Sequence, residues 1–115
     1  QTAPAGHFRP IGNDGFAQRA TGASAQFDQQ PLEAAATIDA CLAAWRATKA
    51  ANWRKHAALA YDWFLGGNDL GAEIAEEDGG CFDGLHESGV NLNQGAESIL
   101  AFQMSNVALS LVGRV

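Results

Sequence analysis

The spacing of apolar residues after Pro31 restricts the fold of this chain more than any other feature. Four apolar side chains recur there at positions i, i+3, i+4 and i+7, namely Ile38, Cys41, Leu42 and Trp45. This is the period of one face of an α-helix. Most residues between them are alanines, which have the highest helix propensity. The pattern therefore predicts a helix over residues 31–49 with one buried face.

A second apolar stripe begins four residues after the expected end of the first helix. Its members stand at i, i+4, i+7 and i+11, and they are Trp53, Ala57, Ala60 and Phe64. Asn52 is a suitable N-cap and Gly66-Gly67 is a suitable stop, so we expect a helix over residues 52–65. Because the break between the two helices is short, residues 31–65 are predicted to form an antiparallel helical hairpin.

The C-terminal segment carries a third stripe at helical spacing, which consists of Leu100, Met104, Val107 and Leu111. Only a thin polar stripe accompanies it, made of Gln103, Asn106 and Ser110. We expect a helix from about Gly95 to Val112, within the segment 93–113. With so little polar surface, this helix is predicted to be the most buried of the three.

The other segments are irregular in pattern. Residues 1–26 are rich in turn-forming glycine and proline and form an irregular N-terminal arm in our prediction. Residues 66–92 form a long loop that holds seven of the 13 acidic residues, and loops of this length are usually functional or mobile. The fold class we expect is all-α, a single domain of 115 residues built from three main helices.

Composition narrows the classes of partner. The chain is 47% apolar and 17% charged, which argues against disorder. Its net charge of -6 argues against a nucleic acid or an anionic membrane surface as partner and favours a neutral or cationic ligand. There is no apolar run long enough to span a membrane and no signal-peptide pattern, so a soluble protein is expected. Because the chain starts at Gln1 with no structural signal, we expect a C-terminal piece of a longer protein.

The cysteines and histidines show no spacing that indicates a disulfide or a metal site. Cys41 and Cys81 lack the spacing of a disulfide framework or a metal motif, so both are predicted to be free thiols in a reducing cytoplasm. The three histidines, His7, His56 and His86, are scattered, and no pair has the spacing of a zinc site. The sequence therefore predicts no metal and no cofactor.

One polar signature occurs twice, each time at the start of an expected helix. Residues Gln30 to Glu33 and Gln94 to Glu97 both read Gln-x-x-Glu. A capping box explains a glutamate at this position of a helix, and that alternative stays open. However, Asp28 and Asn93 lie beside these motifs and supply more donors and acceptors than a cap needs. The surplus favours a polar pocket.

The directions of the helices allow these clusters to meet. If the first helix runs up and the second returns, the third can run up again after its loop, which places both polar helix starts at one end. The loop over residues 79–90 leads into the same end. We therefore expect one rim that gathers the titratable groups Asp28, Glu33, Asp83, His86 and Glu97.

Five ordered strings carry a family resemblance: Gly6–Gly15, Phe27–Ala34, Tyr61–Leu70, Gly79–Leu85 and Asn91–Ser98. They resemble the C-terminal helical region of bacterial proteins described as glycosyltransferases, over most of the chain. The resemblance implies a fold similar to the six-hairpin α/α toroids of glycosidases and sugar epimerases, in which inner helices place carboxylates at a central mouth. Three helices supply only an arc of such a toroid, so the chain is expected to be a fragment of a toroid-like domain.

The resemblance also implies a carbohydrate substrate. Cleavage of a glycosidic bond requires two carboxylates separated by about 5 to 9.5 Å. Catalytic roles are expected for Asp83, as the group that handles the proton, and for Glu97 and Asp28, as acceptors for sugar hydroxyls. Substrate contacts are expected from six further residues, with the Trp63 ring stacking on a sugar: Glu33, Gln30, Asn93, Gln94, His86 and Trp63.

Two other functions remain open. No glycine loop that binds phosphate and no basic clamp occurs, so a nucleotide-sugar site is expected to lie outside this chain. One alternative is a non-catalytic helical module that binds a domain of its parent chain or a second copy of itself through apolar faces. The other is a fragment that resembles a glycoside hydrolase.

Overall fold

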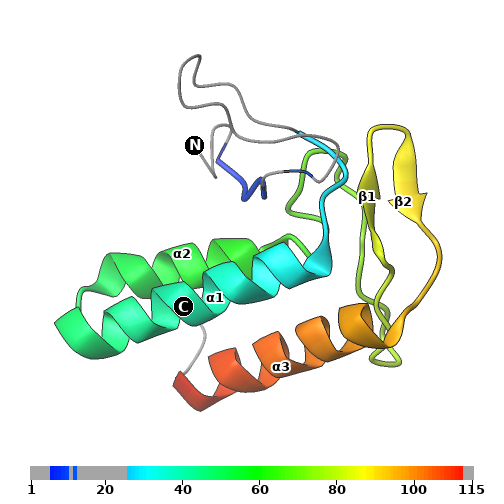
Figure 1. Cartoon of the computed structure of the whole chain (residues 1–115). Coiled ribbons are helices and arrows are strands. Elements are labelled where there is room, and N and C mark those ends of the chain that lie inside the picture. Colours follow the sequence, from blue (N-terminus) through cyan, green and yellow to red (C-terminus); the bar gives the residue numbers. More distant parts are fainter. Residues whose placement is uncertain (1–5, 11, 13–25, 113–115) are drawn as a thin grey trace.

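The computed structural model describes residues 6–10, 12 and 26–112. Three helices and one short β-hairpin follow one another in the order α1, α2, β1, β2 and α3. Helix α1 packs against both α2 and α3, and the hairpin stands beside the starts of α1 and α3 (Figure 1). The predicted arm over residues 1–26 lies mostly outside the described residues.

Helix α1 (Pro31–Thr48) agrees with its apolar spacing. Pro31 occupies the first turn, where the missing N–H of proline costs nothing. The helix ends where Lys49 takes a left-handed conformation with φ of 58° and donates its N–H to the Trp45 carbonyl at 2.7 Å. Ile38, Cys41 and Leu42 are buried, as predicted.

Helix α2 (Ala51–Asp62) runs antiparallel to α1, so the predicted helical pair is present (Figure 1). Its boundaries differ from the prediction. Ala50, not Asn52, is the N-cap, and it contributes no side-chain hydrogen bond. At the other end the Asp62 carbonyl accepts the N–H groups of Leu65 at 2.9 Å and of Gly67 at 2.7 Å. These bonds turn the chain three residues before the expected end of the helix.

Helix α3 (Ala96–Val112) corrects the prediction that this helix is the most buried. The four apolar residues of the predicted stripe are 56% to 82% exposed, and these are Leu100, Met104, Val107 and Leu111. The buried face carries Ser98, Ala101, Phe102, Ser105 and Leu109 instead. Small residues on that face allow a close approach between helices. Because both faces have helical spacing, periodicity alone did not identify the one that packs.

The segment predicted as a long loop contains a small antiparallel sheet, so the expectation of an all-α fold is only approximate. Strands β1 (Gly84–His86) and β2 (Gly89–Asn91) pair with Leu85 opposite Val90. Leu85 also exchanges both backbone hydrogen bonds with Gln29, at 2.8 and 2.9 Å. The hairpin is thereby joined to the segment that precedes α1.

The core lies where the helices meet the loop segment. Its largest fully buried side chains include Trp63, Phe64, Ile38, Leu42, Ile74 and Leu85. Tyr61, Phe64 and Phe102 form a cluster of aromatic rings, with centroids 5.2 to 6.1 Å apart. Among the described helices, none combines the length and apolar character needed to cross a membrane.

Candidate functional site

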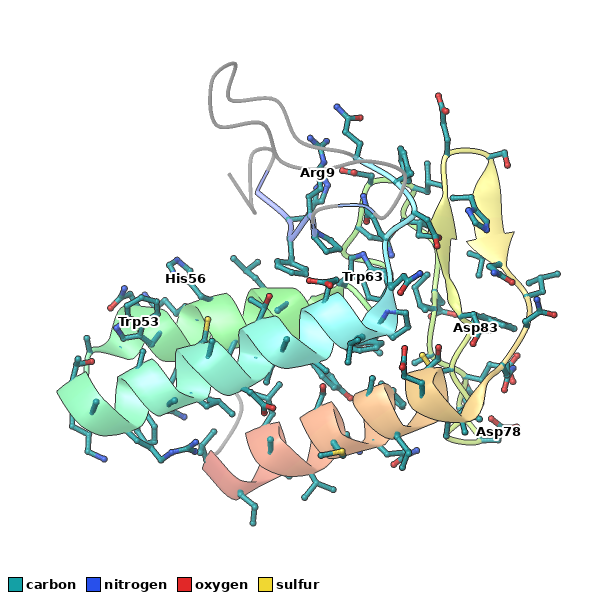
Figure 2. All side chains as sticks on the ribbon, viewed as in Figure 1. Arg9, Trp53, His56, Trp63, Asp78 and Asp83 are labelled. Carbon is teal, nitrogen blue, oxygen red and sulfur yellow. The ribbon has the colours of Figure 1, made fainter. Side chains whose placement is uncertain are left out.

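A polar pocket of about 390 Å³ opens where three segments of the chain meet. These segments are residues 28–30, which we call the strip before α1, the hairpin, and the first turn of α3. Asp83 lies between the hairpin and α3 (Figure 2). The pocket is lined by Asp28, Gln30, Asp83, Asn91, Gly95, Ala96, Glu97 and Ser98. All three residues predicted as catalytic therefore border one pocket, which we call the rim pocket.

Asp28 is held from two sides. Its Oδ2 accepts a hydrogen bond from Gln30 Nε2 at 3.0 Å, and His86 Nδ1 lies 3.3 Å from its Oδ1. The Asp28 side chain is 17% exposed, while that of His86 is 47% exposed. Oδ1 is itself buried and accepts no hydrogen bond from any described residue. Protonation of His86 would place a positive charge beside this oxygen.

The close fit of Asp28 against β1 depends on Gly84. A Cβ added at Gly84 would lie 2.8 Å from the Gln29 carbonyl oxygen and 2.9 Å from Asp28 Oδ1. Both distances are too short for a methyl group to fit without a shift of the backbone. Glycine at this position therefore allows the strip before α1 and the hairpin to meet.

Asp83 connects the hairpin to α3. Its Oδ1 accepts the Gly95 N–H at 2.6 Å, just before the first residue of the helix. Its own backbone N–H donates to the Asn93 carbonyl at 2.8 Å. Asp83 therefore acts as a hydrogen-bond acceptor at the start of α3, and it borders the rim pocket.

The other predicted residues are dispersed. Gln30 lines the rim pocket and His86 reaches it through Asp28. Glu33, Asn93 and Gln94 are exposed but do not line the pocket.

The prediction that the Trp63 ring stacks on a sugar is wrong. Its side chain is fully buried, and its Nε1 donates to Gln29 Oε1 at 2.9 Å. The indole therefore has no exposed face on which a sugar ring can stack. It packs edge to face against Phe64, with centroids 5.3 Å apart, and serves the core.

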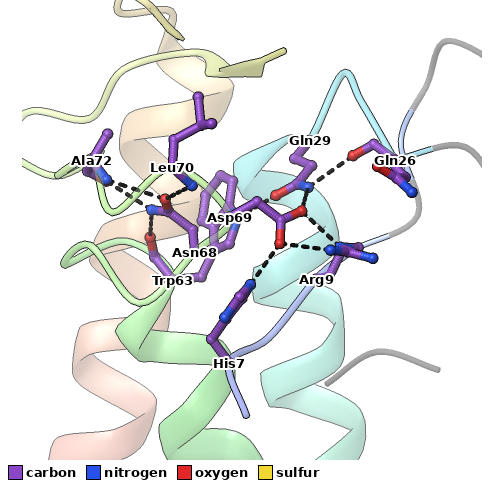
Figure 3. Close-up of polar contacts among 9 residues, drawn as sticks. All are labelled: His7, Arg9, Gln26, Gln29, Trp63, Asn68, Asp69, Leu70 and Ala72. Atoms are coloured by element: carbon purple, nitrogen blue, oxygen red, sulfur yellow. Dashed lines mark hydrogen bonds and ion pairs between the residues drawn. The ribbon is translucent and has the colours of Figure 1, made fainter. Parts of the chain in front are cut away.

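Sequence reasoning missed a second polar cluster, which we call the Asp69 network (Figure 3). Asp69 accepts hydrogen bonds from Arg9 Nε at 2.7 Å, Arg9 Nη2 at 3.0 Å and Gln29 Nε2 at 2.9 Å. His7 Nε2 lies 2.6 Å from its Oδ1. The Asp69 side chain is only 9% exposed. The network ties the segment 6–10 to the turn after α2 and to the strip before α1.

The electrostatics of this network are well defined. Burial alone would raise the pKa of Asp69, but hydrogen bonds from Arg9, His7 and Gln29, with the charge of Arg9, outweigh burial and lower the pKa to about 2. The carboxylate is therefore charged at any pH near neutrality. Because each acceptor oxygen already has protein donors, we interpret the Asp69 network as structural support.

Asn68 stabilises the turn that follows α2. Its Nδ2 donates to the carbonyls of Trp63 at 2.9 Å and Ala72 at 2.7 Å, while its Oδ1 accepts the N–H groups of Leu70 and Ala72. Every hydrogen-bonding position of this amide is used. The signal in the sequence was the string that runs from Gly66 to Asp69, whose turn residues are typical of a tightly bonded loop.

No protein-family model and no curated protein matches this chain. The rim pocket offers three carboxylates and the amides of Gln30 and Asn91. Such a set accepts hydrogen bonds from hydroxyl groups, while its amides donate to hydroxyl oxygens.

Proposed function

We propose that this chain is a sugar-binding helical domain of a carbohydrate-active protein, similar to the helical region of the bacterial glycosyltransferase-named family. One observation carries the proposal. Asp28, Asp83 and Glu97, far apart in sequence, line one pocket together with two amides. Carboxylates that accept hydroxyl hydrogen bonds form short, charge-assisted contacts, and a ring of several such groups suits a polyhydroxylated ligand.

The same carboxylates are the proposed catalytic set. Asp28 and Glu97 bind hydroxyls, and Asp83 orients the first turn of α3 through its bond to Gly95. Catalysis on a glycosidic bond needs one protonated acid opposite an ionised group. In this proposal Asp83 is the group that handles the proton, and it borders the same pocket as Asp28 and Glu97.

A toroid-like fold belongs to this proposal. The three helices form an arc of a larger α/α assembly, in which a neighbouring domain of the parent chain supplies the opposite wall of the site. Buried free thiols at Cys41 and Cys81 fit a reducing cytoplasm, and a net charge of -6 disfavours nucleic acid as partner.

A titration of matched variants tests sugar binding. Glu97→Gln keeps the size of the side chain but removes a carboxylate from the rim pocket. Glu87→Gln makes the same change on an exposed residue between β1 and β2, away from the pocket. We expect calorimetry with neutral mono- and oligosaccharides to show binding that Glu97→Gln weakens about tenfold, the equivalent of 1.4 kcal/mol, and that Glu87→Gln preserves. Equal affinities in both variants would limit Glu97 to a role at the helix start.

A second candidate function is a non-catalytic interaction module. The observation that favours it is the apolar stripe of α3, where Leu100, Met104, Val107 and Leu111 are all more than half exposed. Contiguous exposed apolar surface marks sites of association in many proteins. A module of this kind would bind a protein surface and show no response to sugars.

A further inference from the structure

Positive charge gathers at one end of the helices. The segment 40–61 contains four bases and no acidic residue, although the whole chain has a net charge of -6. These bases are Arg46, Lys49, Arg54 and Lys55. They stand on both sides of the turn between α1 and α2, at the end of the two helices that points away from the hairpin (Figure 1). We call residues 45–56 the α1–α2 tip.

The acidic residues are separated from this tip. The nearest acids in sequence are Asp39 on α1 and Asp62 on α2, each seven residues from the closest base, which is about 10 Å along a helix. Asp78 and Asp83 lie at the opposite end of the molecule from Trp53 (Figure 2). Salt screens charges over about 8 Å at physiological ionic strength. A compact ligand at the tip therefore meets its bases with little opposition from these acids.

Three of the four bases are available to an external anion. The side chains of Arg46, Lys49 and Lys55 are exposed. Among the residues that the structure describes, no carboxylate forms an ion pair with any of the three. Arg54 has a structural role, because its Nη2 donates to the Val112 carbonyl at 3.1 Å, at the end of α3.

The ends of the helices account for only some of these charges. Arg46 and Lys49 suit the C-terminus of α1, where positive charge is favourable. A helix N-terminus favours acids instead, yet the first turn of α2 contains none and its N-cap, Ala50, makes no side-chain hydrogen bond. Lys55 follows this turn directly. The positive end of α2 thus adds to the charge of Lys55, which no local preference of the helix explains.

Two indole rings lie among the bases. Trp45 and Trp53 are both partly exposed. Lys49 Nζ lies 4.6 Å from the centroid of the Trp45 ring, and Arg54 Cζ lies 5.2 Å from it, so this ring helps to hold both cations in place. Tryptophan and arginine are the residue types that contribute most often to the binding energy of protein interfaces. The composition of the tip is therefore typical of a surface that binds protein.

We propose that the α1–α2 tip binds an acidic segment of another protein. Its exposed bases pair with carboxylates, and the Trp45 and Trp53 rings cover the apolar stems of aspartate and glutamate side chains. A short acidic segment contacts the tip alone. A long nucleic acid or an anionic membrane surface would also face the acidic remainder of the chain, which repels it. This interaction is independent of sugar binding, because the rim pocket lies at the other end of α1.

Calorimetry with an acetylated decaglutamate peptide tests the proposal. We expect the wild-type chain to bind this peptide, with an affinity that falls as salt is added. Lys55→Gln and Arg46→Gln should each raise the dissociation constant about fivefold, because each removes one exposed positive charge from the tip. Amide shifts in a labelled sample should be confined to residues 45–56.

The matched control is Ser88→Asp, which lowers the net charge by the same amount at an exposed position between β1 and β2. It should preserve the affinity, and far-UV circular dichroism should show unchanged helix content in all three variants. Three results would each overturn the proposal: no binding of the peptide, equal weakening by Ser88→Asp and Lys55→Gln, or tighter binding of a single-stranded DNA oligonucleotide or of phosphatidylserine vesicles. Sugar titrations of the same variants report on the rim pocket separately.

Discussion

Arg9 and Asp69, 60 residues apart in sequence, are joined by two parallel hydrogen bonds of 2.7 and 3.0 Å. This paired geometry is the strongest way for a guanidinium to hold a carboxylate. Asp69 also accepts from Gln29, whose backbone pairs with Leu85 of the hairpin. Because Gln29 is the neighbour of Asp28, the Asp69 network supports the strip that carries one wall of the rim pocket.

Removal of the Asp69 charge should therefore destabilise the fold. Asp69→Asn leaves Arg9 without its charged partner, and we expect a loss of about 1.5–3 kcal/mol in the free energy of unfolding. Urea denaturation measures this loss. Asp62→Asn makes the same chemical change on an exposed side chain and should cost little. Equal losses in the two variants would contradict the structural role of the network.

The same carboxylate predicts an acid limit to stability. Its pKa is lowered from 3.8 to about 2 in the folded chain, so the stabilisation is complete above pH 3.8 and is lost as the pH falls toward 2. A shift of this size corresponds to about 2 kcal/mol. The gap in unfolding free energy between wild type and Asp69→Asn should narrow across that window. A gap that stays constant down to pH 2 would show that Asp69 is not the titrating group.

Gly84→Ala should disturb both stability and the rim pocket. The added methyl group meets the Gln29 carbonyl and Asp28 Oδ1, and overpacking of this kind costs about 1–3 kcal/mol. Thermal unfolding measures the cost, and amide shifts of Asp28 and Leu85 report the local displacement. Ser88→Ala changes an exposed position between β1 and β2 and should be neutral. A stable Gly84→Ala variant with unmoved amides would refute the close fit.

The two thiols should resist modification while the chain is folded. Burial raises the pKa of the Cys81 thiol to about 12, with a further contribution from the charge of Asp83, and burial also raises the pKa of Cys41. A thiol of this kind is almost entirely protonated at neutral pH and reacts slowly, because the thiolate is the nucleophile. A disulfide reagent should label both cysteines rapidly in urea and slowly without it. Rapid labelling of Cys81 in the native chain would contradict its burial.

Local pattern was enough to predict much of the helical structure. The spacing of Ile38, Cys41 and Leu42 identified α1 and its buried face, since one face of that helix is apolar. It failed for α3, which has an apolar stripe on one side and small residues with Phe102 on the other. The face with Phe102 packs against the rest of the chain, including α1. Such contacts between distant residues cannot be read from the local sequence of α3.

The sequence predicted the rim residues but not the Asp69 network, because that network depends on contacts between distant residues. The direction of the helices was enough to predict that Asp28, Asp83 and Glu97 share one end. The contacts that Asp69 makes in its network join residues 40 to 62 positions apart, and no local motif marks them. The hairpin was missed because its strands have only three residues each, too few for a visible alternation.

The most direct measurement is a nuclear magnetic resonance titration of the isotopically labelled chain with neutral mono- and oligosaccharides. The proposed function predicts that the amides of residues 28–30, 83–86 and 91–98 shift together, with one common affinity, while those of the exposed α3 stripe stay in place. A well-dispersed spectrum in which no rim amide moves with any sugar would contradict the proposal that the rim pocket binds carbohydrate.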